Sequence, residues 1–240
     1  MQTKGRVAGI MQPYFFPYLG YWQLVSKVDV FVILQRVKFV KQSWINRNFV
    51  LGSGENVLIS VPLEKASDFA LIEDRKVSDV WTNTRGKILR QIQHVYGQSP
   101  FFEEISSWLK EQLSFPEKNL SNYLEHQIRS TASLLDINTK IVAEKDLGDF
   151  SEFERSSRIF GICKSLECDA YLNLPGGRSL YSRDSFRKAH IKLGFLDPFL
   201  PAYPQGRIDF VSSLSVIDSL FWNGPMKTAE MVRLGDVQWE

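Results

Sequence analysis

A strand–loop–helix–strand pattern at the start of the chain constrains the fold more than any other feature. Short apolar runs at residues 7–11 and 30–34 are typical of buried strands. Between them, residues 12–19 contain two prolines and must form a loop, whereas residues 20–27 have the apolar spacing of a short helix. A helix that joins two strands in this way makes them parallel neighbours in one sheet. The sequence therefore predicts an α/β protein.

The rest of the chain continues the alternation of strands and helices. Residues 56–63 and 169–174 are predicted to be further strands, and Ser151 with Glu154 has the pattern of a capping box before a helix. Apolar residues at helical spacing fill the middle of the chain, and Gly97 is expected to end the first of these helices. Alternating elements of this kind indicate a mainly parallel, Rossmann-like sheet.

We expect one domain over residues 1–240, with each part of the chain contributing one kind of structure. Residues 1–65 and 168–210 form the α/β core, and residues 78–166 are largely helical. Residues 212–235 form C-terminal helices, which are expected to break at Asn223-Gly224-Pro225.

Charge and composition exclude several classes of protein. The chain has 29 Lys and Arg against 27 Asp and Glu, so it lacks the basic field of a duplex-binding protein, and no DNA partner is expected. Its longest aliphatic or aromatic run, residues 30–34, is far shorter than the roughly 20 residues of a membrane helix. The N-terminus has no signal-peptide pattern, so a cytoplasmic protein is expected. Cys163 and Cys168 match neither a zinc nor a disulfide pattern, and no metal is predicted.

The loop after the first strand is the most unusual segment. Residues 12–22 contain six aromatic residues and follow the strand at its carboxyl end, where open α/β sheets bind ligands. The segment is either a hydrophobic plug or a wall that stacks on a sugar or base while its phenols form hydrogen bonds. In the second case the candidate binding residues are Gln12, Tyr14, Tyr18, Gly20 and Tyr21. Gly20 would let a phosphate or sugar approach the start of the helix.

A basic segment follows the second strand. Residues 36–47 contain four basic residues interleaved with Phe39 and Trp44, which suits a diphosphate or the single-stranded end of an RNA. The alternative is an ordinary solvated edge. The candidate binding residues here are Lys41, Trp44, Asn46 and Arg47.

Two glycines follow the strand that is predicted at residues 169–174. Residues 171–186 are typical of a strand, a glycine loop and a short helix, and glycine loops after strands can cradle phosphates. The alternative is a tight turn. The candidates are Gly176, Gly177 and Tyr181. If both strands lie parallel in one sheet, this loop and residues 12–21 border a single pocket, with Asn46 and Arg47 reaching in.

Few residues have the context of catalytic groups. Among the three histidines, His190 is best placed because it follows the glycine loop and the short helix, and Asp184 is a second candidate base. Neither cysteine lies in the context of a nucleophile, and no Walker, zinc or Gly-x-Ser-x-Gly motif is present.

Four blocks of the sequence together resemble the WbqC-like family of bacterial surface-polysaccharide gene clusters. The most specific is MQPYFFPYLGY at residues 11–21. The others are residues 44–48, residues 171–186, and residues 214–221 with Asn223 and Gly224. The family pattern often has an acidic pair after the second strand, where this chain has Gln35 and Arg36.

This resemblance implies an N-acyl or aminoacyl transferase, for example a glycyl transferase. The acceptor would be a nucleotide-linked amino sugar used for O-antigen or other lipopolysaccharide synthesis. The activated donor is open: acyl-CoA, aminoacyl-tRNA or an adenylate made on the enzyme. The cofactor is unknown.

The first βαβ unit also resembles the HIGH-motif nucleotidyltransferases, which belong to the HUP class of Rossmann-like folds. Tyr18 and Tyr21 occupy the two histidine places of that motif, and a tyrosine can donate a hydrogen bond but cannot become cationic. Two alternatives to acyl transfer therefore stay open: an ATP-using nucleotidyltransferase, and a non-catalytic module that binds a sugar nucleotide.

Overall fold

A mostly parallel sheet forms the centre of the protein. The computed structural model describes residues 5–53, 55–150, 152–206 and 209–240. Five strands of the sheet are parallel, and the last strand of the chain joins one edge antiparallel. In spatial order the strands are β5 (Lys140–Ala143), β2 (Val30–Ile33), β1 (Val7–Met11), β6 (Ala170–Asn173), β7 (Lys192–Asp197) and β8 (Asp236–Trp239).

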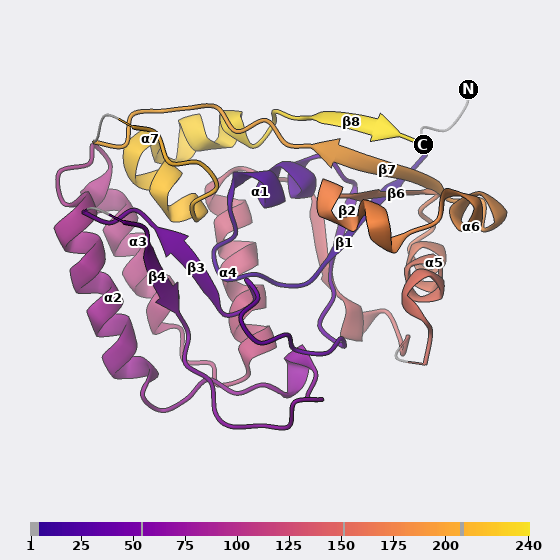
Figure 1. Cartoon of the computed structure of the whole chain (residues 1–240), viewed down its shortest axis with the longest axis horizontal. Helices are drawn as coiled ribbons and strands as arrows, with labels where there is room; N and C mark the ends of the chain where they lie inside the picture. Colours follow the sequence, from indigo (N-terminus) through magenta and orange to yellow (C-terminus); the bar gives the residue numbers. More distant parts are fainter. Residues whose placement is uncertain (1–4, 54, 151, 207–208) are drawn as a thin grey trace.

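Helices cover both faces of this sheet (Figure 1). Along β2, Val30 and Val32 pack in one hydrophobic cluster, and Phe31 and Ile33 pack in the other, because successive side chains of a strand point to opposite faces. The first cluster includes residues of α5 (Arg155–Ser165) and α6 (Arg183–Lys188). The second includes residues of α1 (Leu19–Ser26), α4 (Leu120–Leu134) and α7 (Val216–Met231). Burial on both faces explains why the strands are apolar throughout.

A smaller layer lies beside the sheet, at the left of Figure 1. It contains the antiparallel hairpin of β3 (Arg47–Val50) and β4 (Val57–Ser60), which is separate from the central sheet. The helices α2 (Trp81–Tyr96) and α3 (Phe102–Ser114) complete it. Three short 3-10 segments lie in connections of the described chain: η1 (Ile72–Asp74) between β4 and α2, η2 (Glu144–Asp146) after β5, and η3 (Pro175–Leu180) after β6.

The structure confirms the α/β class and the parallel βαβ unit, and it corrects several details. Strand β5 lies inside the part of the chain that we expected to be helical, and it extends the central sheet beside β2. The strand expected at residues 56–63 is β4, which pairs only with β3 among the described strands. Local sequence does not encode the partners of a strand, so neither the place of β5 in the sheet nor the separate pairing of β4 follows from it.

Helix ends differ modestly from the prediction. Ser99 and Pro100 have the pattern of an N-cap and a first helical residue, but α3 begins at Phe102, with Phe101 as its N-cap. Ser151 of the expected capping box lies outside the described residues, and α5 is preceded by Glu154, which makes no side-chain capping bond. The expected break in the last helix is present as a kink at Gly224, where φ is 71°.

The order of the strands defines where a ligand can bind. From β1 the chain passes through α1 to β2 on one side, whereas β6, reached much later, pairs with the other side of β1. Loops that leave the carboxyl ends of β1 and β6 therefore diverge and leave a crevice between them. None of the helices in the described ranges is both long and apolar enough to cross a bilayer.

Candidate functional site

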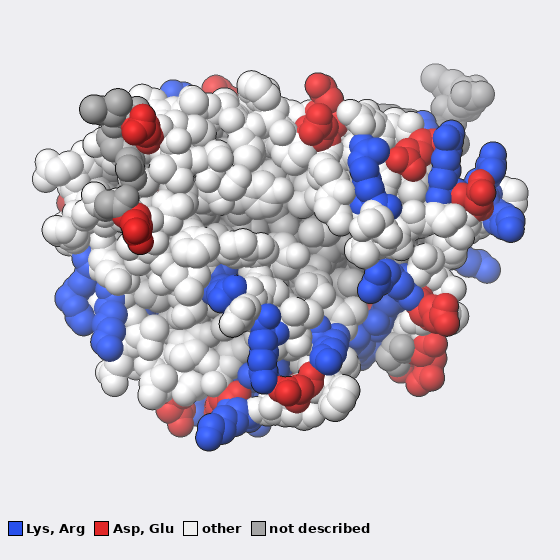
Figure 2. All heavy atoms as spheres, viewed as in Figure 1, with Lys and Arg blue, Asp and Glu red and all other residues white. Residues whose placement is uncertain are grey.

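A cavity of about 770 Å³ opens at the carboxyl ends of β1 and β6. Ile10, Met11 and Gln12 line it from the end of β1, and Asn173 and Leu174 line it from the end of β6. Figure 2 shows that the middle of this face is hollowed, and that Lys and Arg side chains gather to the right of the hollow and below it. The cavity therefore occupies the crevice that the strand order creates.

Both of the strand-end loops that we singled out form its walls. Tyr14 and Tyr18 line the cavity from the aromatic loop, and Gly176, Gly177 and Tyr181 line it from the segment after β6. The predicted shared pocket thus exists as a geometric feature. Further lining residues come from the segment after β2, from the residues just before α5 and from α5 itself: Lys38, Val40, Trp44, Phe153, Arg155, Arg158 and Ile159.

The aromatic loop is fixed by bonds to its backbone. Asn48 Nδ2 donates to the Phe16 carbonyl oxygen at 2.7 Å, and the Ser215 hydroxyl donates to the same oxygen at 2.7 Å. Trp22 Nε1 donates to the Pro17 carbonyl oxygen at 3.0 Å. Because these donors come from three separate parts of the chain, the loop has one preferred shape before any ligand binds.

The tyrosines of the cavity are hydrogen-bond donors at neutral pH. Burial raises the pKa of Tyr14 and of Tyr181 above the ordinary value of 10.0. Burial, followed by the neighbouring Tyr14, also raises the pKa of Tyr18. The phenols consequently stay protonated and can donate to a ligand oxygen, but they are poor bases.

Positive charge predominates in the cavity. Lys38, Arg155 and Arg158 line it, and no described lining residue is a carboxylate, an imidazole or a thiol. The part of the chain that the structure describes also contains no group of three or more His, Cys, Asp or Glu placed to hold a metal ion. The cavity is therefore suited to an anionic ligand with rings that stack on aromatic side chains.

Two candidate residues of the aromatic segment lie behind the wall. Tyr21 is fully buried, and its hydroxyl donates to the Gln12 carbonyl oxygen at 3.1 Å. Gly20 is covered by the Tyr18 ring, because a Cβ on Gly20 would lie 2.5 Å from that ring. Gly20 thus makes room for Tyr18, and our expectation that it admits a ligand to the helix start was wrong. Of the two tyrosines at the HIGH-motif places, Tyr18 lines the cavity and Tyr21 does not.

The basic segment contributes Trp44 but not its other candidates. Lys41 is exposed and pairs with Asp68 at 2.5 Å. Asn46 Nδ2 donates to the Val61 carbonyl oxygen at 2.8 Å, and Arg47 donates to the Gln42 carbonyl oxygen. These side chains hold the β3–β4 hairpin and its approach, so they do not reach into the cavity as we expected.

Both candidate bases also lie elsewhere. His190 follows α6 and precedes β7, so it is at the amino end of a strand whose parallel neighbours carry the cavity at their carboxyl ends. Asp184 is exposed in the first turn of α6 and pairs with Arg187. A connection between parallel strands must return to the opposite end of the strands, and for this reason His190 is distant from the glycine loop although it is only 13 residues after Gly177.

The structure adds three cations to the predicted site residues. Lys38 belongs to the basic segment after β2, and Arg155 and Arg158 belong to α5. The two arginines are three residues apart and therefore share one face of α5. That spacing was the available signal, but only the position of α5 beside β1 connects it to the cavity.

Two adjacent glycines provide a test of how tightly this wall is packed. A Cβ on Gly177 would lie 2.3 Å from Asn173 Nδ2, whereas a Cβ on Gly176 would have no heavy atom within 4 Å. We expect Gly177→Ala to displace the Asn173 amide and to lower the free energy of unfolding by about 1 kcal/mol. Gly176→Ala should be neutral. Chemical denaturation of both variants checks this, and equal stabilities would contradict the packing described.

Comparisons with known proteins agree on the family. A model of the WbqC-like protein family matches residues 12–230. Uncharacterized protein Rv1507c of Mycobacterium tuberculosis is 26% identical over 218 residues, which cover 88% of this chain and 91% of that protein. No solved structure matches the chain significantly. Since the matched range spans most of the chain and includes both loops that wall the cavity, the protein belongs to the WbqC-like family.

Proposed function

We propose that the protein transfers an acyl or aminoacyl group, for example glycyl, to the amine of a nucleotide-linked amino sugar during synthesis of a bacterial surface polysaccharide. The observation that carries this proposal is the make-up of the cavity at the ends of β1 and β6. Aromatic rings and three cations line it, without a described carboxylate. The volume of about 770 Å³ falls in the range of roughly 300–1,000 Å³ that is usual for sites of small molecules.

A sugar nucleotide fits these features because it combines rings with a diphosphate. Tyr14, Tyr18, Trp44 and Tyr181 offer faces and edges for the base or the sugar ring. The cations offer charge-assisted hydrogen bonds to phosphate oxygens. An uncharged oligosaccharide would leave these cations without a counter-charge.

The reaction requires little from the protein beyond positioning. The lone pair of the sugar amine attacks the carbonyl carbon of the donor and a C–N bond forms. The bond from that carbon to the thiol sulfur of CoA, the ribose oxygen of tRNA or the phosphate oxygen of an adenylate breaks. The amine proton passes to that leaving group, directly or through water. Protonated phenols can donate to the oxyanion that develops on the carbonyl oxygen. Holding both substrates in reacting geometry supplies a large part of the rate, so no protein nucleophile is needed.

Mass spectrometry tests the proposal directly. The purified protein is incubated with amino sugars linked to UDP, GDP, dTDP or CMP, together with acyl-CoA, glycyl-tRNA, or glycine and ATP. A sugar nucleotide that gains the mass of the acyl group is the expected result. No gain with any donor would refute transfer, and release of pyrophosphate from ATP without acylation would instead indicate a nucleotidyltransferase.

One observation favours a second candidate function. Because no described residue of the cavity wall is a carboxylate, imidazole or thiol, the same cavity suits a non-catalytic module that binds a sugar nucleotide. Calorimetry distinguishes the two: tight binding of one sugar nucleotide without turnover by any donor supports the module, and turnover by the pure protein excludes it.

A further inference from the structure

Arg158 occupies an unusual position among the cations of the cavity. It lies in α5, lines the cavity and has a side chain that is only 10% exposed. Its Nε atom donates to Glu144 Oε1 at 2.7 Å. Its Nη2 atom is buried and has no hydrogen-bond partner among the described residues. One edge of the guanidinium is therefore held by the protein, and part of its donor capacity is left unused.

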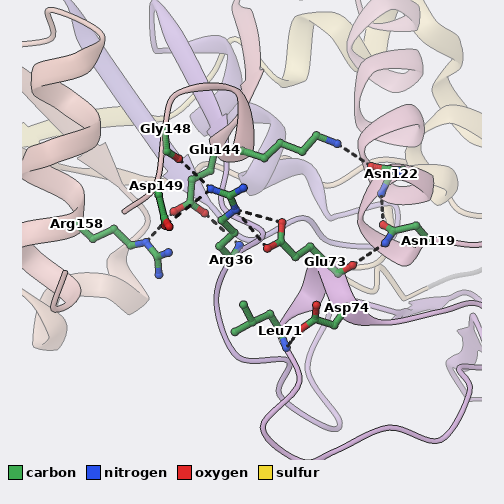
Figure 3. A network of polar contacts seen from close by, with 11 residues as sticks. Arg36, Leu71, Glu73, Asp74, Asn119, Asn122, Glu144, Gly148, Asp149 and Arg158 are labelled. Atoms are coloured by element: carbon green, nitrogen blue, oxygen red, sulfur yellow. Dashed lines mark hydrogen bonds and ion pairs between the residues drawn. The ribbon is translucent and has the colours of Figure 1, made fainter. Parts of the chain in front are cut away.

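The residue that holds Arg158 is itself fixed. Glu144 is fully buried in η2, and its Oε2 atom accepts a hydrogen bond from the backbone N–H of Arg36 at 3.1 Å. Arg36 in turn pairs with Glu73 at 3.3 Å and donates through Nη1 to the Gly148 carbonyl oxygen at 3.0 Å. Figure 3 shows Glu144 between Arg36 and Arg158 in this network. Residues from four parts of the chain thus determine where the Arg158 guanidinium lies.

A buried, unpaired charged donor is unfavourable unless something else satisfies it. Leaving a buried donor without a partner costs about 1–3 kcal/mol, and more for a charged group. The exposed part of the Arg158 side chain lines the cavity, so a small shift of the guanidinium would let an oxyanion of a ligand supply the missing acceptor. An arginine is especially suited to this role because its planar fork binds phosphate oxygens through two parallel hydrogen bonds. Lys38 and Arg155, on the same cavity, add positive charge.

We infer that Arg158, positioned by Glu144, binds a phosphate oxyanion of the ligand in this cavity. The inference deepens the proposed function and rests on it for the origin of the phosphate, which is the diphosphate of a sugar nucleotide. It replaces Lys41 and Arg47, the phosphate ligands that the sequence indicated. Arg158 contacts the ligand, whereas Glu144 is a positioning residue that acts through Arg158.

Calorimetric titration with inorganic pyrophosphate tests this role without requiring that the sugar be known. We expect Arg158→Gln to weaken pyrophosphate binding by roughly 10- to 100-fold, as expected for loss of a hydrogen bond from a charged donor. Arg158→Lys keeps the charge but loses the fork, and it should weaken binding by roughly tenfold. Arg187→Gln, which removes an exposed arginine from α6 outside the cavity, should bind as the wild type does.

The positioning role of Glu144 is tested by comparing ligands with and without phosphate groups. Glu144→Gln should weaken binding of pyrophosphate and of nucleoside diphosphates several-fold and leave the affinity for the matching uncharged nucleosides unchanged. A merely structural loss would affect both kinds of ligand. Because Arg158→Gln leaves Glu144 as an unpaired buried charge, the double variant Glu144→Gln with Arg158→Gln serves as the neutral reference if the single variant does not fold.

The outcomes separate this inference from the proposed function. Arg158-dependent pyrophosphate binding, with no sugar nucleotide bound or acylated, supports the phosphate site and refutes the transferase. Acylation of a sugar nucleotide with an unchanged KM in Arg158→Lys supports the transferase and overturns the phosphate site. Absence of pyrophosphate binding to the wild type at millimolar concentration also overturns it.

Discussion

Replacing Asp218 with alanine is expected to lower the free energy of unfolding by about 3 kcal/mol, because three buried or partly buried donors would lose one shared acceptor. Asp218 is fully buried near the start of α7. Its Oδ1 atom accepts from the Tyr203 hydroxyl and from Gln205 Nε2, each at 2.8 Å, and its Oδ2 atom accepts from the Tyr96 hydroxyl at 2.8 Å. Chemical denaturation measures the change.

An exposed aspartate supplies the matched control for this prediction. Asp79 forms an ion pair with Lys118 at 2.8 Å, and its side chain is 82% exposed. Asp79→Ala should therefore change stability by less than about 0.5 kcal/mol. Equal effects of the two substitutions would show that the Asp218 cluster contributes nothing specific to the fold.

The same carboxyl group predicts a pH dependence. Burial raises the pKa of Asp218 above its ordinary value of 3.8, so the folded protein binds a proton more readily than the unfolded chain does. Between the two pKa values, the contribution of Asp218 to the free energy of unfolding must fall as the pH rises. Denaturation of the wild type and of Asp218→Asn over the acid range should show this decline in their difference. A difference that increases with pH would contradict it.

Filling the cavity is expected to weaken ligand binding strongly without destabilising the protein. Gly176 is exposed at the cavity wall, and a Cβ there would have no heavy atom within 4 Å. The indole of Gly176→Trp would occupy the space between the two loops. We expect the affinity for the bound sugar nucleotide to fall by roughly 100-fold, which corresponds to about 2.7 kcal/mol.

Calorimetry and thermal denaturation of the same samples check both halves of this prediction. Gly86→Trp is the control, since Gly86 lies on α2 away from the cavity and the nearest atom to its Cβ position is Arg90 Nη1 at 3.7 Å. Unchanged binding by folded Gly176→Trp would place the ligand somewhere other than this cavity.

The sequence allowed prediction of those features that depend on local pattern plus the geometry of parallel strands. The βαβ unit follows from apolar runs and prolines within residues 7–34. Because β1 and β6 are parallel neighbours, the loops after them leave the same end of the sheet. This explains why Tyr18 and Tyr181 line one cavity. What these residues bind stays a proposal.

The other parts of the site depend on pairings between distant segments. Asn46 and Arg47 have the chemistry of binding residues, but their hairpin pairs outside the central sheet and uses their side chains internally. Arg158 lies in a helix whose pattern indicates only an apolar face, and its role depends on η2 reaching the same place. The contacts that a side chain makes in the structure, rather than its residue type, show whether it supports the fold or is a candidate ligand-binding group.

The hydrogen bonds that hold the aromatic loop determine when this wall of the cavity can form during translation. The Phe16 carbonyl oxygen and its partner Ser215 are separated by 199 residues in the chain. Synthesis adds roughly 5–20 residues per second, so Ser215 is added about 10–40 seconds after Phe16. The ribosome also covers the most recent residues, so this wall is completed only after Ser215 has left the ribosome. Until then, a ligand has no finished site to stabilise.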